Sequence, residues 1–159
     1  GKERVIPVLF PPAPGPRLVI SMDTFTFTQT EDGKVAWVLN AKSADLYENK
    51  EAELKDVQIV FKNADSREAT MFGDLASMDT GSGNASVHRD TQDVRIVTSD
   101  GYLLTTDSLF WKAGERQVWT ADPFKLLGKE IYLEGVGITA DVDMRKIAVK
   151  DNVKAVLQK

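Results

Sequence analysis

Apolar and polar residues alternate with a period of two in six or more short segments between Thr24 and Leu157. A period of two places alternate side chains on opposite faces of an extended strand, whereas a helix repeats every three to four residues. Gly, Asp, Asn or Pro bound each segment at intervals of about 8–12 residues, which is typical of a β-sandwich, roll or barrel. The pattern therefore predicts an all-β fold with one apolar face on each strand.

Two Asp-Gly pairs predict hairpins within this pattern. Asp32-Gly33 separates the alternating run that contains Phe25 and Phe27 from the run that begins at Val35, and Asp100-Gly101 separates residues 94–97 from residues 102–106. Asp-Gly favours the tight turn that joins antiparallel strands. The Glu-rich stretch 48–55 lacks an apolar stripe at helical spacing, so we expect a turn leading into a strand and no helix of ten residues anywhere.

The N-terminal segment differs from the rest of the chain. Residues 11–17 hold four of the six prolines, and proline fixes the backbone and removes N–H donors. We therefore predict a flexible, Pro-rich segment over residues 1–17 and a single β domain over residues 18–159. The chain has 159 residues, which suits one domain.

Composition excludes several functions. Basic residues are scattered and the formal net charge is −4, so we expect no nucleic-acid partner. The absence of cysteine excludes disulfides, thiolate metal sites and a cysteine nucleophile. No run approaches the ~18 apolar residues that a membrane-spanning helix needs. We predict no cofactor.

Reaction chemistry is also missing from the sequence. His88 is the only histidine, so a Ser-His-Asp triad or a zinc site would depend on it, and no nucleophile motif lies nearby. We interpret His88 as an exposed residue at a strand edge, and residues 79–84 as a hairpin loop rather than a calcium site. Most acids sit at turns, where carboxylates cap the backbone. The sequence predicts neither catalytic nor metal-binding residues.

The apolar faces of the predicted strands supply the candidate functional surface. From the pattern alone, these side chains form either a sealed, dry core or an apolar groove, and composition does not separate the two. The residues are Phe25, Phe27, Trp37, Leu39, Val57, Ile59, Phe61, Leu109, Trp111, Ile131, Leu133 and Ile138.

The order of five motifs closely resembles the LptC family, the membrane-anchored periplasmic components of the bacterial lipopolysaccharide exporter. Each motif alone has low specificity, but their order and spacing cover about residues 22–157. The motifs are WVLNAKSA at 37–44, LKDVQIVF at 54–61, VRIVTSDGYLLTT at 94–106, WTADPF at 119–124 and LEGVGI at 133–138.

This resemblance implies a fold and a function. It implies an open, twisted antiparallel β-jelly-roll of two facing sheets, whose apolar interior holds the acyl chains of lipopolysaccharide without enzymatic chemistry. The twelve residues above would then contact lipid. The resemblance also implies a periplasmic location and a tether to the inner membrane through an N-terminal helix that is missing from this chain.

The partners follow from the same resemblance. The N-terminal edge would dock on LptF/LptG-type subunits of the inner-membrane ABC transporter, which would supply the lipid and the energy. The C-terminal edge would pass lipid to an LptA-type bridge protein. Because an unpaired edge strand is a template for strand addition, this edge also allows self-association. Its residues are Val153, Lys154, Ala155, Val156 and Leu157.

Two alternatives stay open. The chain could be a soluble bridge of the LptA type, which shares the repeat. It could instead be a carbohydrate-binding β-sandwich, whose marker would be surface aromatic residues beside a pair of carboxylates together with a closed core.

Overall fold

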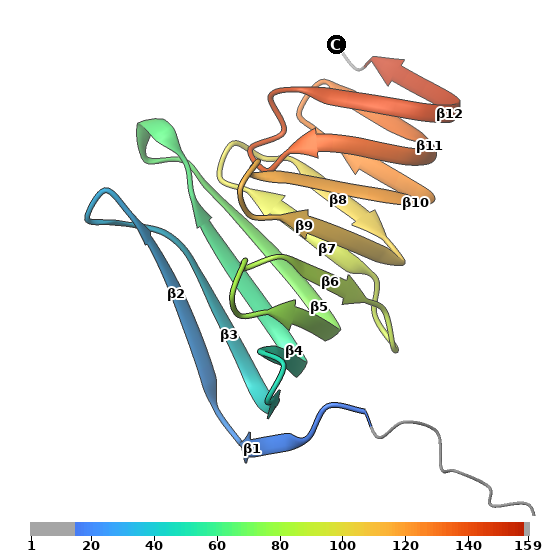
Figure 1. Cartoon of the computed structure of the whole chain (residues 1–159). Coiled ribbons are helices and arrows are strands. Elements are labelled where there is room, and N and C mark those ends of the chain that lie inside the picture. Colours follow the sequence, from blue (N-terminus) through green and yellow to red (C-terminus); the bar gives the residue numbers. More distant parts are fainter. Residues whose placement is uncertain (1–14, 158–159) are drawn as a thin grey trace, which may run out of the picture.

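The computed structural model describes residues 15–157, and most of them lie in antiparallel strands (Figure 1). The short 3-10 turn Ala64–Ser66 is the one helical element in that part of the chain. The expected absence of long helices is therefore confirmed for these residues. The strands are β1 (Leu18–Met22), β2 (Phe25–Glu31), β3 (Lys34–Tyr47), β4 (Glu51–Lys62), β5 (Glu68–Asp79), β6 (Ala85–His88), β7 (Val94–Thr98), β8 (Leu103–Thr106), β9 (Ser108–Lys112), β10 (Gln117–Leu127), β11 (Ile131–Asp141) and β12 (Ile147–Leu157).

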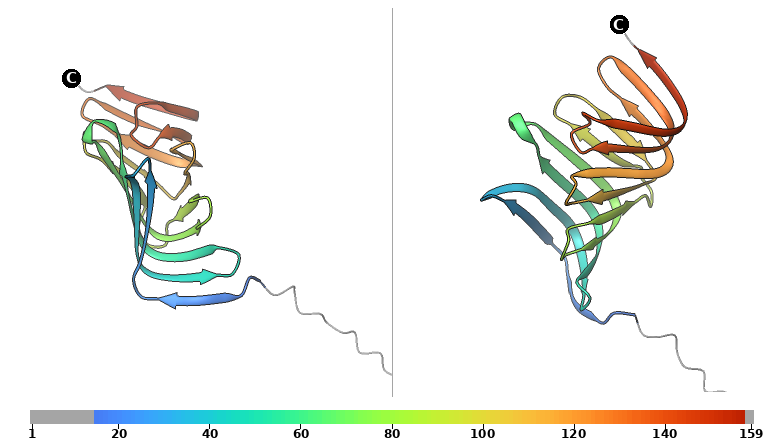
Figure 2. Two further views of the ribbon diagram at one scale, coloured as in Figure 1. Left: turned by 60° about the vertical axis from the view of Figure 1, so that its left-hand side comes forward. Right: turned by 45° about the horizontal axis from the view of Figure 1, so that its top comes forward.

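The long strands bend once and so contribute to two layers of one 12-stranded sheet. The first layer runs in the order β2-β3-β4-β5-β7-β8-β10-β11-β12, and the second runs β1-β3-β4-β5-β6-β9-β10-β11-β12. Figure 2 shows the layers meeting at an angle. The predicted antiparallel jelly-roll is confirmed, and its two facing sheets are halves of one continuous sheet.

A shift in the inside-outside pattern makes the corner between the layers. In β4, Leu54 and Val57 both face the interior, while Lys55 and Asp56 between them are both exposed. Asp56 takes a left-handed backbone conformation with φ of 52°. The neighbouring strands β3 and β5 change face at 42–43 and 74–75, opposite the same corner. Two consecutive outward residues in each strand therefore turn the sheet as a unit.

The C-terminal half of the sheet turns its corner with bulges. The pairing of β10 with β11 shifts between Thr120 and Pro123, and that of β11 with β12 shifts between Glu134 and Val136. Gly137 lies at this corner with φ of 79°, and a β-carbon there would lie 3.0 Å from the Lys150 side chain. A bulge adds local bend and twist, so these shifts continue the corner from β5 to β12.

Apolar side chains from both layers fill the space between them. At the centre, the ring centroid of Trp111 lies 4.4 Å from that of Phe61 and 6.4 Å from that of Trp37. All three side chains are buried. Burying aromatic side chains contributes about 25 cal/mol per Å² of apolar surface, so this cluster holds the two layers together.

Candidate functional site

The structure places all the predicted interior residues on the inner faces of the two layers. Phe27, Ile131 and Leu133 are half-buried, and the other predicted side chains are buried. The segments that contribute them are far apart in the sequence but meet in one cluster. Contact of these residues with lipid stays a prediction. The buried set comprises Phe25, Trp37, Leu39, Val57, Ile59, Phe61, Leu109, Trp111 and Ile138.

The C-terminal end of the roll exposes part of the apolar interior. Leu133 pairs with Ala155, and Ile131 pairs with Leu157, so these side chains share one inner face of β11 and β12. No described strand follows β12, and Leu157 is 77% exposed. An apolar inner surface therefore continues to the end of the roll and reaches solvent there.

The predicted C-terminal edge residues 153–157 form the last part of β12. Among the described strands, β12 pairs with β11 alone, so its other side presents unpaired backbone N–H and C=O groups. Val153 is 55% exposed and Val156 is 42% exposed. Such an edge can accept a further strand.

The N-terminal edge of the roll is divided between two strands. β1 covers the second layer by pairing with residues 44–47 of β3, and β2 covers the first layer by pairing with residues 34–41. Leu18, Val19 and Ile20 of β1 are exposed. Within residues 15–157, both ends of the roll thus carry apolar residues beside a strand edge that pairs with no further strand.

The outer face of the second layer carries a feature that sequence reasoning missed. Phe110 and Trp119 are cross-strand neighbours whose rings stack at 4.4 Å, and a cavity of about 370 Å³ lies beside them. A larger cavity of about 520 Å³ on the same face is lined in part by Asp45, Glu53 and His88. The sequence contained a signal for this pair, because Phe110 and Trp119 occupy positions where the alternation in their strands predicts outward-facing side chains.

The structure corrects the prediction that His88 is an exposed residue at a strand edge. The side chain is half-buried, and the strand β6 pairs with β5 on one side and β9 on the other. His88 therefore lies inside the sheet rather than at an exposed edge. Its ring centroid lies 6.2 Å from that of Phe110, in an edge-on arrangement. The aromatic neighbour on β9, distant in sequence, accounts for this burial.

The carboxylate of Asp79 caps the backbone of the loop after β5. This carboxylate accepts hydrogen bonds from the N–H groups of Gly81 at 2.7 Å and Ser82 at 3.2 Å, which confirms residues 79–84 as a hairpin loop.

Across residues 15–157, no group of three or more His, Asp or Glu side chains is arranged to hold a metal ion. In the same range, no helix is long and apolar enough to cross a membrane.

Asp74 fixes the loop between β6 and β7, which lies on the closed side of the roll, where the strands turn the corner. Its Oδ2 accepts hydrogen bonds from the backbone N–H groups of Asp90, Thr91 and Gln92 at 3.0, 2.7 and 2.8 Å. These bonds, led by that of Gln92, hold the pKa of the Asp74 carboxyl below its ordinary value. The carboxylate thus ties the loop between β6 and β7 to the corner of β5.

Together these features define a class: open jelly-roll proteins with an apolar interior and an unpaired strand edge at each end. The family model described as lipopolysaccharide-assembly, LptC-related matches residues 17–158. The chain therefore belongs to the LptC-related family, and the resemblance inferred from the sequence is confirmed. This membership identifies a periplasmic protein of lipopolysaccharide transport from a family associated with the inner membrane.

A solved structure shares the fold. The crystal structure of LptH from Pseudomonas aeruginosa, described as the LptA homologous periplasmic component of the lipopolysaccharide transport device, superimposes with a TM-score of 0.62. The similarity covers 77% of this chain and 95% of LptH at 12% sequence identity. A comparison with curated protein sequences finds no match. At this identity the likeness to LptH shows the fold alone.

Proposed function

We propose that this protein is a non-enzymatic conduit that takes the acyl chains of lipopolysaccharide into the interior of the roll and passes them to the next protein. The observation that carries the proposal is the apolar inner surface, which runs between the layers from β1 to β12 and reaches solvent at Leu133 and Leu157. Apolar burial at about 25 cal/mol per Å² would hold acyl chains there, so release requires energy from the transporter.

Site-specific photo-crosslinking tests the proposal. A photo-reactive residue at Ile59 or Leu133 faces the interior, whereas the same residue at Gln58 points outward from the same strand as Ile59. We expect lipopolysaccharide adducts at Ile59 and Leu133 and none at Gln58. Labelling that is equal at all three positions, or absent from the inner ones, would refute a lipid-holding interior.

We further propose that the C-terminal edge receives an LptA-type bridge and the N-terminal edge receives LptF/LptG-type subunits of the ABC transporter. Strand addition to β12 would place the partner's interior next to Val153 and Leu157, which are exposed and apolar. The double variant V153E/L157E should weaken binding of an LptA-type protein. The control L127E changes an exposed residue on the outer face of β10 and should leave binding intact.

The exposed edge of β12 could also pair with a second copy of this chain, and the variant V153E/L157E tests this self-association. If copies of this chain pair through β12, the oligomer should dissociate on dilution and should be lost in V153E/L157E. If sedimentation shows a monomer at all protein concentrations, self-association is refuted, and binding of an LptA-type partner stays the proposed role of this edge.

The proposed tether to the inner membrane separates the LptC-type role from the alternative of a soluble LptA-type bridge. The fold shared with LptH supports the alternative as well. The gene sequence upstream of Gly1 decides between them. An apolar segment of ~20 residues there supports the tether, and a cleavable signal peptide supports the soluble bridge.

The stacked pair of Phe110 and Trp119 favours carbohydrate binding as a second candidate function. The cavity beside it is lined by Ser77, Ser86 and Glu51, which offer hydrogen-bonding groups next to an aromatic surface. A glycan array should then show binding that is lost in W119A and retained in V97A, which changes an exposed residue of the other layer. No binding by the unmodified protein would eliminate this candidate.

A further inference from the structure

The side of the roll opposite the corner is bridged by loops from both layers. The first layer contributes residues 62–67, between β4 and β5, and residues 99–101, between β7 and β8. The second layer contributes residues 113–116 and 141–146, the turns that follow β9 and β11. We call these four segments the lateral clasp. None of the strands described in residues 15–157 crosses from layer to layer here, whereas β3, β4, β5, β10, β11 and β12 do so at the corner.

One arginine makes the hydrogen-bonded part of the lateral clasp. Nη2 of Arg116, in the second layer, donates to the carbonyl oxygen of Lys62 at 3.0 Å and to Oδ1 of Asn63 at 2.8 Å, both in the first layer. The carbonyl oxygen of Arg116 in turn accepts from the N–H of Val142 at 3.1 Å. Arg116 thereby links three of the four segments.

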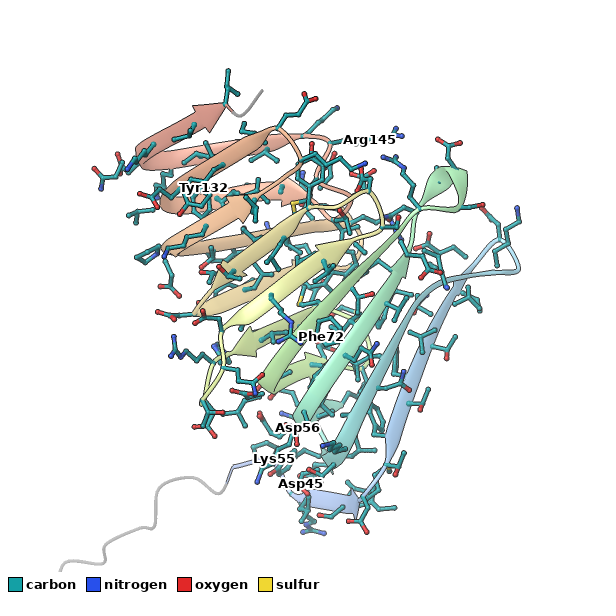
Figure 3. All side chains as sticks on the ribbon, turned by 180° about the vertical axis from the view of Figure 1, so that it is seen from behind. Asp45, Lys55, Asp56, Phe72, Tyr132 and Arg145 are labelled. Atoms are coloured by element: carbon teal, nitrogen blue, oxygen red, sulfur yellow. The ribbon has the colours of Figure 1, made fainter. Side chains whose placement is uncertain are left out.

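The remaining bridges are ion pairs at longer distances. Arg67 in the first layer lies 3.6 Å from Asp143 in the second, and Arg145 in the second lies 3.5 Å from Asp65 in the first. Figure 3 shows Arg145 next to the loop between β4 and β5. Arg67 also approaches Asp100 at 3.8 Å. These contacts exceed ordinary charge-assisted hydrogen-bond lengths of about 2.7–2.9 Å, so they attract without fixing geometry.

Unsatisfied polar atoms concentrate in the same segments. Among residues 15–157, the buried side-chain nitrogens that lack a hydrogen-bond partner are Nδ2 of Asn63, Nε and Nη2 of Arg67, and Nε1 of Trp111. Three of these four atoms belong to the lateral clasp. Native proteins leave few such atoms, because a buried donor without a partner loses its hydrogen bonds to water and gains none in return, so each one calls for an explanation.

Backbone strain concentrates there too. Asp65, Ser66, Arg116 and Met144 have φ of 62°, 59°, 51° and 62°, in the left-handed region that ordinary side chains avoid. These are four of the eight non-glycine residues with positive φ in the described part of the chain. Strain of this kind clusters at sites that switch between two arrangements. The lateral clasp thus combines long ion pairs, buried donors without hydrogen bonds and strained turns, on a side of the roll that none of the described strands closes.

We propose that the lateral clasp is a releasable closure, and that its opening separates the two layers so that a lipid chain can enter the filled interior from the side. This inference rests on the proposed function for the identity of the lipid, but the closure itself is a property of the fold. The continuous corner is the hinge, and the clasp is where separation begins.

The charges of the lateral clasp can be removed with a matched control. D143N weakens the pairs that Asp143 makes with Arg67 and Arg145, while D107N weakens the Arg89–Asp107 pair at 3.3 Å on the closed side. The ion pairs of Asp143 are long and only partly buried, so each contributes little, and we expect amide hydrogen exchange at the ends of β4 and β11 to rise about two- to tenfold in D143N. D107N should leave this exchange unchanged. Equal exchange in the two variants would overturn the proposal.

A reversible bridge tests whether opening admits lipid. The chain has no cysteine, so D65C/R145C can be joined selectively across the lateral clasp by a cleavable bismaleimide. Lipopolysaccharide capture by a photo-reactive residue at Ile59 is then measured. We expect the bridge to slow capture about tenfold or more, because binding scales with the fraction of open molecules, and cleavage should restore it. The same variant capped with N-ethylmaleimide, and R89C/D107C bridged on the closed side, should capture normally.

The outcomes separate the two proposals. Equal capture by bridged and capped D65C/R145C would overturn the lateral clasp and leave the conduit intact. If unmodified protein and capped variant both fail to capture lipopolysaccharide, the proposed function fails, and the hydrogen-exchange comparison of D143N with D107N alone decides whether the clasp opens.

Discussion

Gly83 provides a direct test of how the hairpin after β5 supports the interior. Gly83 has φ of 80°, and a β-carbon there would lie 2.8 Å from the ring of Trp37 and 3.3 Å from Ala113. Trp37 is 1% exposed, and its ring stacks on Phe27 at 5.3 Å and meets Trp111 edge-on at 6.4 Å. The indole therefore has little room to move away from an added methyl group.

Two costs follow for G83A. A left-handed conformation costs an alanine about 1–2 kcal/mol relative to glycine. Overpacking against the Trp37 ring costs about 1–3 kcal/mol more. The free energy of unfolding should therefore fall by about 2–5 kcal/mol, which lowers the Tm by roughly 4–20 °C in a domain of this size.

Urea unfolding followed by tryptophan fluorescence measures this change. The matched control is G114A, because Gly114 lies in a turn where an added β-carbon meets nothing within 4 Å and φ is not left-handed. We expect G114A to stay within about 0.5 kcal/mol of the unmodified protein. A G83A variant as stable as G114A would show that the Trp37 cluster adjusts freely and that the packing argument is wrong.

Three further predictions concern single side chains. L109A removes a fully buried side chain and should cost about 2–5 kcal/mol in urea unfolding, whereas L127A on the exposed outer face should cost under about 0.5 kcal/mol. Because the pKa of Asp74 is lowered in the folded protein, its carboxylate stabilises the fold above the unfolded pKa, and this stabilisation is lost as pH falls through the folded pKa. The variant D74N should therefore be less stable at neutral pH. In an acid titration, its free energy of unfolding should fall less than that of the unmodified protein. The hydrogen bond from Tyr132 to Glu134 raises the pKa of Tyr132. The bond therefore stabilises the fold below the ordinary tyrosine pKa, and this stabilisation is lost as pH rises through the raised pKa. An alkaline titration of Y132F should lack the corresponding fall in the free energy of unfolding. An identical pH profile for either variant and the unmodified protein would contradict the corresponding assignment.

The strands and their inner faces could be predicted because alternation is a local signal. The positions of Ile59 and Phe61 on one face of β4 follow from their spacing. The corner was also encoded locally, since Lys55 and Asp56 break the alternation between two buried residues. The prediction placed Lys55 at the end of a turn over residues 48–55, whereas the structure places it inside the bent strand β4. The bend could not be recognised from one strand, because a single strand does not show that its neighbours change face opposite the same point.

The lateral clasp and the surface cavities could not be predicted in the same way. Arg67 pairs with Asp143 across 76 positions of the chain, and this proximity depends on how the two layers twist. The burial of His88 likewise depends on Phe110 of a neighbouring strand. The predicted flexible segment 1–17 lies almost wholly outside the described residues, so it stays a prediction.

The division of the N-terminal edge between β1 and β2 has a mechanical consequence. β1 is joined to β3 by four paired residues and β2 by seven, and the two strands cover different layers. A force applied to the chain before Leu18 would therefore load β1 first. β1 would peel away from the second layer one pair at a time, while β2 kept the first layer covered. The roll can thus yield at one margin under tension without exposing both of its layers.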